Sequence, residues 1–372
     1  MGGTASRARF ASRPRRRPTA WRLGLLAVVA SAAAAIPVVA SAGTSSQYRQ
    51  TNLISDIPGV ARITDPNLVN PWGQAAASPT SPLWVADNGT NVSSLYRGGV
   101  NGGIPQIAPL VVSIPEGAPT GVVFNPTGDF VVRTEAGSAP ANFIFDSEAG
   151  RITTWSKAVS GTKAKIEFTS RNSVDKGLAL ASAGGAHFLY ATNFHEGRID
   201  VLNAHFKPVG TPGGFKDPGI PAGFAPFGIQ VLGGELYVTY AKQDAAKHDD
   251  VAGPGNGFVD VYDTSGHLLR RLISRGDLNS PWGLTLAPAS FGAFGGDLLV
   301  GNFGDGAIHA YDPTTGAEKG QLTNTDGNPI LIDGLWGLRF GNGTFATDGT
   351  LVFTAGIGGE GHGLLGEIAP AG

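Results

Sequence analysis

A short phrase recurs six times along this chain of 372 residues. Each copy sets a glycine beside an apolar residue and follows it, about ten to twenty residues later, with an aliphatic and aromatic run. The marker glycines are Gly73, Gly121, Gly177, Gly228, Gly283 and Gly337. They lie 48 to 56 residues apart, which is the period of a propeller blade and not of a helical solenoid repeat. The sequence therefore predicts an all-β fold, a six-bladed β-propeller whose blades start near residues 71, 119, 176, 226, 281 and 335.

Each copy is predicted to form a blade of four antiparallel strands. The glycine step begins the first strand, and the aliphatic and aromatic run forms the second, as in residues 83–88 and, in the second copy, residues 130–133. The third strand follows a tight glycine turn and alternates apolar with polar residues, as half-buried strands do. The fourth strand has the weakest pattern. The chain has 56 glycines and 25 prolines, which act as turn signals between these short runs.

The last copy ends near Ile368 after only three strands. A sheet cut short in this way would leave a bare edge, which propellers avoid by taking a strand from the other end of the chain. Residues 50–55 precede the first copy and have no blade of their own. We therefore expect the segment 43–57 to supply the outer strand of the last blade, with the propeller itself spanning residues 58–372.

Residues 1–42 have the composition of a secretory signal. They contain seven arginines and no acidic residue, followed by an apolar stretch from residue 23 to residue 40 and the small residues Ala40, Ser41 and Ala42. This order predicts a cleaved signal peptide and a secreted protein, extracellular or periplasmic, with no membrane span after cleavage. A retained membrane anchor is the alternative, since the stretch approaches the length that spans a bilayer. The run Arg15-Arg16-Arg17 leaves the export route open.

Removal of this segment makes the chain clearly acidic. The remaining residues hold 20 basic and 29 acidic side chains, a formal charge of −9. A surface of this sign repels phosphate backbones, so we expect no nucleic-acid partner. The chain has no cysteine, which excludes disulfides, thiolate metal sites and cysteine nucleophiles. Some 330 residues bury enough core to fold without such links.

Three tryptophans occupy one position of the repeat, directly before the marker glycine: Trp72, Trp282 and Trp336. We expect these rings to pack between neighbouring blades and to have a structural role. The glycine beside them is expected to allow close approach of the innermost strands around the axis, where a side chain would not fit.

Polar residues are expected to gather around one mouth of the channel. In a four-stranded meander the loops after the second strand and the loops leading into the first strand open on the same face. Among the residues at the ends of the second strands, Asp87, Asn193 and Asn302 offer oxygen ligands of the kind that a hard cation such as calcium prefers. Their placement in alternate blades makes them candidate metal ligands. Alternatively, they end strands because Asn and Asp bond to their own turns.

Residues just beyond these strand ends are candidates for binding and catalysis. His195 is the best single candidate for a general base, with Asp244 as a second proton-transfer group, although a solvated loop histidine is the alternative. Residues 241–257 form the longest predicted insertion at this mouth, and long loops in compact domains are often functional. A merely solvated loop is the competing interpretation. The predicted binding set is Asn88, Lys242, Asp244, His248 and Asp305.

Five phrases resemble a family of secreted bacterial proteins that has no assigned biochemical function. They are TDPNLVNPWG at 64–73, WVADNGT at 84–90, YAKQD at 240–244, GPGNGFVDV at 253–261 and GNFGDG at 301–306. The resemblance runs from about Thr51 to the C-terminus. It implies export and a six-bladed propeller similar to NHL-repeat and TolB-like proteins, and it supplies no catalytic residue.

A fainter resemblance is to the gluconolactonase and regucalcin group, whose propellers hold one divalent cation with a Glu, two Asn and an Asp. It implies that Asn193 and Asn302 are the amide ligands and that Asp87 is the acid. This chain has no glutamate at the equivalent start of its first blade.

Two functions follow. The first is a secreted binding scaffold that uses the channel mouth and loop 241–257 to hold a protein, a glycan or a small ligand. The alternative is a lactonase-like hydrolase with calcium or another divalent cation at the axis. A serine hydrolase is excluded because the chain has no G-x-S-x-G motif.

Overall fold

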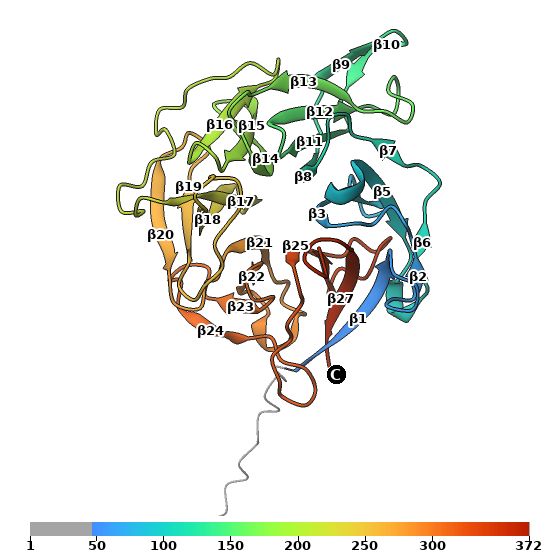
Figure 1. Cartoon of the computed structure of the whole chain (residues 1–372), viewed down its shortest axis with the longest axis vertical. Coiled ribbons are helices and arrows are strands. Elements are labelled where there is room, and N and C mark those ends of the chain that lie inside the picture. The colour runs from blue at the N-terminus through green and yellow to red at the C-terminus, as the bar shows by residue number, and fades with distance from the viewer. Residues whose placement is uncertain (1–46, 372) are drawn as a thin grey trace, which may run out of the picture. The chain divides into compact units, whose positions relative to one another are not determined.

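The computed structural model describes residues 47–371, and within this range the protein is a ring of small antiparallel β-sheets (Figure 1). The predicted signal peptide lies outside these residues. Three short 3-10 turns, Asn88–Thr90, Val100–Gly102 and Gly292–Phe294, are the helical elements of the described part. Within that part, no helix is long and apolar enough to cross a membrane. The prediction of an all-β six-bladed propeller is confirmed.

The blades follow one another along the chain, each listing its strands here from the axis outward. Blade 1 contains β3 (Pro71–Ala75), β4 (Leu83–Asp87), β5 (Val92–Arg97) and β6 (Gln106–Ile107), with β7 (Val112–Ser113) also paired to β5. Blade 2 contains β8 (Pro119–Phe124), β11 (Phe143–Ser147), β12 (Arg151–Trp155) and β13 (Lys165–Thr169). Blade 3 contains β14 (Asp175–Ala183), β15 (Ala186–Asn193) and β16 (Arg198–Asn203), and its fourth position is reduced to a bridge between Leu202 and Pro208.

The second half of the ring is built in the same way. Blade 4 contains β17 (Phe224–Leu232), β18 (Glu235–Lys242), β19 (Gly257–Tyr262) and β20 (Leu268–Ser274). Blade 5 contains β21 (Pro281–Leu286), β22 (Leu298–Asn302), β23 (Ile308–Tyr311) and β24 (Glu318–Gln321). Blade 6 contains β25 (Leu335–Phe340), β26 (Leu351–Ala355), β27 (Leu364–Pro370), β1 (Tyr48–Ser55) and the short β2 (Ile63–Thr64).

The ring is closed by the N-terminal strand, as predicted. β1 pairs antiparallel with β27 from Tyr48 opposite Pro370 to Ser55 opposite Leu364, and β2 pairs parallel with β1 (Figure 1). The side chains of Tyr48, Leu53 and Ile54 are fully buried. The closing strand therefore covers the edge of β27 and also contributes to the core.

The predicted second strand of blade 2 is wrong. Residues 131–134 form β9 (Val131–Thr134), which pairs only with β10 (Gly137–Pro140) in a separate hairpin, and β11 takes the second place in the blade. Phe130 has a left-handed backbone with φ 56°, and its ring is buried, so the chain turns away from the blade here. The mouth positions of this blade consequently belong to Ser147 and Glu148, and Thr134 and Glu135 lie on the hairpin.

The marker glycines let the innermost strands approach one another, as expected. A Cβ built on Gly228 would lie 2.2 Å from the carbonyl oxygen of Trp282 in the next blade, and one on Gly337 would lie 2.5 Å from that of Trp72. Gly73, Gly121 and Gly283 meet the next inner strand in the same way. Since no side chain fits at these distances, glycine is required there by packing.

Candidate functional site

Aromatic rings close the channel at the level of the marker glycines. The residues directly before these glycines are Trp72, Thr120, Lys176, Phe227, Trp282 and Trp336. The rings of Trp72 and Trp336 stack with centroids 3.4 Å apart, and Trp282 meets both edge-on at 6.0 and 5.8 Å. The tryptophans thus meet one another across the axis, and the expectation that they pack between neighbouring blades is wrong. The reason is that this repeat position points inward from every blade.

Lys176 is the exception in this aromatic set, and it is buried. Its side chain is only 2% exposed, and its Nζ lies 2.5 Å from Glu148 Oε1 and 3.2 Å from Asp249 Oδ1. The same ammonium lies 5.2 Å from the centre of the Trp72 ring, within range of a cation–π contact. Partial burial opposes ionisation of Asp249, but Lys176 and His248 bring its pKa below the usual value. A paired lysine therefore occupies one position around the axis.

Hydrogen bonds extend this ion pair into a polar network around the mouth. Asn88 Nδ2 donates to Glu148 Oε2 at 3.1 Å, and Asn70 Nδ2 donates to Asn88 Oδ1 at 3.2 Å and to Glu360 Oε2 at 2.7 Å. Trp336 Nε1 donates to Asn70 Oδ1 at 3.0 Å, which ties the network to the aromatic plug. Burial raises the pKa of Glu360. With Lys176 and Asp249, side chains from five of the six blades join in this network.

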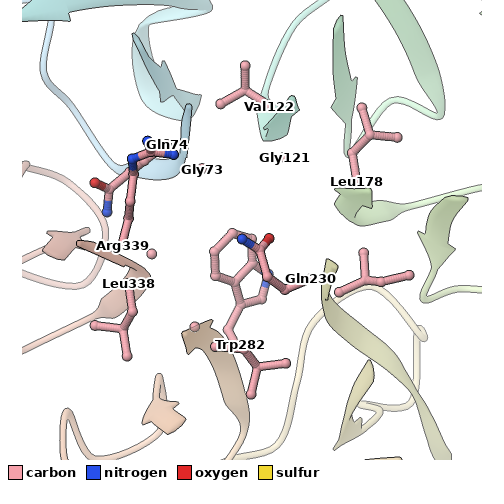
Figure 2. Close-up of a pocket in the computed structure, with 13 residues that line it drawn as sticks. Gly73, Gln74, Gly121, Val122, Leu178, Gln230, Trp282, Leu338 and Arg339 are labelled. Atoms are coloured by element: carbon pink, nitrogen blue, oxygen red, sulfur yellow. The ribbon is translucent and has the colours of Figure 1, made fainter. Parts of the chain in front are cut away.

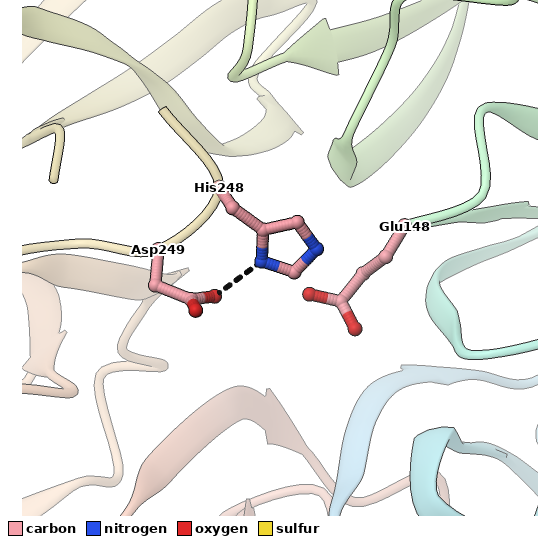
Figure 3. A group of neighbouring side chains, drawn as sticks. All are labelled: Glu148, His248 and Asp249. Atoms are coloured by element: carbon pink, nitrogen blue, oxygen red, sulfur yellow. Dashed lines mark hydrogen bonds and ion pairs between the residues drawn. The ribbon is translucent and has the colours of Figure 1, made fainter. Parts of the chain in front are cut away.

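Loop 241–257 lies at the same mouth. Asp249 reaches Lys176 from this loop, and Figure 3 shows Asp249 and His248 facing Glu148 of blade 2. Asp244 fixes the turn, since its Oδ1 accepts from the backbone N–H of His248 at 2.8 Å. Gln243 Nε2 donates to the carbonyl oxygen of Phe194 at 2.5 Å, which ties the loop to blade 3. The loop is therefore held by specific contacts at both neighbours.

The predicted binding and catalytic residues are only partly brought together. Asn88 and His248 belong to the network, and Asp244 supports the loop from within. His195 is half-buried and contacts the loop through its backbone oxygen, which accepts from Gln243 at 3.3 Å. Lys242 is exposed, and Asp305 accepts from Asn279 Nδ2 at 3.1 Å. The roles assigned to these residues stay predictions.

The three candidate metal ligands occupy equivalent places in their blades. Asp87, Asn193 and Asn302 are fully buried at the ends of β4, β15 and β22. Each bonds within its own blade: Asp87 accepts from the Ser94 N–H, Asn193 donates to Asp200, and Asn302 accepts from the Asn279 N–H. These bonds give each residue a structural part, and their role as metal ligands stays a prediction.

A different set of side chains has the geometry of a metal site. The ligand atoms of Glu148, His248 and Asp249 all lie within 4.8 Å of one another (Figure 3). A second such group, Asp277, His309 and Glu318, lies on blade 5. At the mouth, however, the Lys176 ammonium already neutralises Glu148 and Asp249, so a cation there would compete with it.

Sequence reasoning missed Lys176, Glu148 and Glu360. Lys176 carried a usable signal, because it replaces an aromatic residue at a fixed repeat position. Glu148 was hidden by the wrong strand assignment in blade 2, and Glu360 lies in the loop between β26 and β27, which the repeat does not mark.

No protein-family model matches this chain. Among solved structures, it is similar to a luciferin-regenerating enzyme with 14% identity, a TM-score of 0.49 and coverage of 82% of this chain and 93% of that one. It is also similar to a gluconolactonase from Xanthomonas campestris with 12% identity, a TM-score of 0.48 and coverage of 82% and 86%.

Curated relatives are found in Acanthamoeba polyphaga mimivirus. Uncharacterized protein R648 is 32% identical over 326 residues, which cover 85% of this chain and 78% of the relative. Uncharacterized protein L690 is 33% identical over 300 residues, covering 78% of each. These relatives are viral, so the bacterial origin implied by the resemblance stays an expectation. The chain belongs to the family of these uncharacterised mimivirus proteins.

Proposed function

We propose that this protein is a binding protein whose ligand site is the polar mouth around Lys176, with loop 241–257 as one wall. The observation that carries the proposal is the buried ammonium of Lys176, held between Glu148 and Asp249. Burying a charge is costly even when it is paired, and four of the equivalent positions hold aromatic rings that fill the axis without that cost. Such a departure from the repeat points to a selected polar surface.

The chemistry of the mouth favours a ligand that offers hydrogen-bond donors. Three carboxylates, Glu148, Asp249 and Glu360, surround one ammonium. In the hydrogen bonds described for residues 47–371, Glu360 bonds through Oε2 and Asp249 through Oδ1, which leaves their second oxygens as acceptors. The partly exposed Phe303 ring, stacked on Trp336 at 4.0 Å, adds an apolar face nearby. Carboxylates beside an aromatic face suit hydroxyl groups and the C–H face of a sugar, so we propose a glycan ligand.

A glycan array tests this proposal with the wild-type protein and three variants. We expect the wild type to bind a defined set of glycans, and Glu148→Gln and Lys176→Met to lose at least about tenfold in affinity, since each leaves a buried charged partner unpaired. Glu135→Gln is the matched control, because it makes the same change on the exposed β9–β10 hairpin. Absence of wild-type binding, or equal binding by Glu148→Gln, would contradict the proposal.

A divalent-metal-dependent hydrolase is the second candidate, and the grouping of Glu148, His248 and Asp249 favours it. A cation held there would polarise a carbonyl group of the substrate. Thermal melting with millimolar Ca²⁺ or Zn²⁺ separates the two functions, because a ligand of the folded state must stabilise it. The hydrolase requires a melting shift that His248→Ala removes and that Lys176→Met increases, since the competing ammonium is then gone. An unchanged melting temperature would exclude this second function.

We also propose that the protein is exported, with residues 1–42 as its signal peptide. The support is the order of basic, apolar and small residues in that segment. N-terminal sequencing of the protein recovered outside the cytoplasm should give a chain that begins near Gly43. A protein that retains Met1 would contradict this proposal.

A further inference from the structure

A second polar surface lies on the other side of the aromatic plug, in the channel between the inner strands. A cavity of about 50 Å³ there is lined by Trp282 and by residues of the inner strands, among them Gln74, Gln230 and Arg339 (Figure 2). It continues into a more open cavity of about 170 Å³ that has the same three polar residues on its wall. One water needs only about 10 to 15 Å³ by this measure, so the space admits a small molecule.

Two of these polar residues depart from the repeat. The residue after each marker glycine is Val122, Leu178, Ile229, Leu284 or Leu338 in five blades, and Gln74 in blade 1. One residue further along, Arg339 stands where the other blades have Ala75, Val123, Ala179, Gln230 and Thr285. The fold therefore accepts small or apolar residues at both places, and packing alone does not call for an arginine and a glutamine.

The two side chains meet at one wall of the channel. Gln74 Nε2 lies 3.5 Å from the carbonyl oxygen of Val352, and Val352 is the strand partner of Arg339. The buried Nε of Arg339 and the buried Oε1 of Gln74 have no hydrogen-bond partner among residues 47–371. Burial lowers the pKa of Arg339, and the described residues place no carboxylate in an ion pair with it. A donor and an acceptor are thus left unsatisfied side by side.

We propose that this channel site binds a small hydroxycarboxylate. The guanidinium offers N–H donors in a planar fork that matches a carboxylate, and Gln74 Oε1 accepts the hydroxyl proton of the same ligand. Together they satisfy the two orphaned atoms, each of which is costly to leave unpaired in a buried place. The site is separate from the mouth, because the cavity wall includes Trp282 of the plug and none of Lys176, Glu148 or Asp249.

Thermal melting in sodium glycolate, sodium acetate and sodium chloride of equal concentration tests the site on the full-length protein. We expect glycolate to raise the melting temperature in a saturable way, acetate to bind more weakly because it lacks the hydroxyl, and chloride to have the smallest effect. Arg339→Gln should weaken glycolate binding at least about tenfold. Arg97→Gln, the same change at an exposed arginine, and Glu148→Gln at the mouth should leave it unchanged.

Two variants keep the test decisive if Arg339→Gln fails to fold. Gln74→Leu should make glycolate no better than acetate. Gln74→Glu should supply a carboxylate to Arg339 from within the chain, which raises the melting temperature without ligand and removes the response to glycolate. The proposal is overturned if wild-type melting shows no saturable glycolate response, if chloride acts equally, or if the response survives both Arg339→Gln and Gln74→Glu.

Discussion

A chain shortened to begin at Gly59 is expected not to fold into a closed propeller. The deletion removes β1, with the fully buried side chains of Tyr48, Leu53 and Ile54, and exposes the edge of β27. Burial of three such side chains contributes about 5 to 9 kcal/mol, which is comparable with the whole stability of a typical domain. Tyr48 also stacks on Phe291 at 4.7 Å and donates to its carbonyl oxygen at 3.1 Å, so the loss extends into blade 5.

Circular dichroism melting and gel filtration measure this effect. A chain beginning at Gln47, which keeps all of β1, is the matched control and should melt as the wild type does. We expect the shorter chain to lose its cooperative transition or to aggregate through the exposed strand edge. A cooperative transition at an unchanged temperature in the chain that begins at Gly59 would show that β1 does not close the ring.

Gly228→Ala is expected to have the next largest effect. The new Cβ would lie 2.2 Å from the Trp282 carbonyl oxygen, so blades 4 and 5 must move apart. Such overpacking between two backbones should cost about 3 kcal/mol and lower the melting temperature by about 6 °C or more. Gly210→Ala makes the same substitution where a Cβ meets nothing within 4 Å. Equal melting temperatures of the two variants would contradict the close approach of the inner strands.

The sequence was sufficient for those parts of the fold that repeat. The period of the marker glycines predicts six blades, and the missing strand of the last copy predicts closure by β1, because both follow from the geometry of one blade. Blade 2 was misread because residues 130–133 have the expected pattern at the expected distance, whereas the true second strand follows an inserted hairpin. Pattern alone does not tell which of two suitable runs pairs with β8.

The mouth was harder to predict because its contacts cross the ring. Lys176 meets Glu148 and Asp249, which lie 28 and 73 residues away along the chain. The sequence indicated the face and the loop, but which side chains meet there depends on how far each blade turns around the axis. The tryptophans were misplaced for the same reason, since their shared repeat position could equally well point between blades or toward the axis.

The most direct test of the central claim is hydrogen exchange of the protein with and without a glycan identified on the array. If the mouth around Lys176 is the ligand site, slower exchange should concentrate in loop 241–257 and in the loops that carry Asn88, Glu148 and Glu360, and Lys176→Met should abolish it. Protection confined to the outer strands or to the opposite end of the channel, with these loops unchanged, would contradict the account.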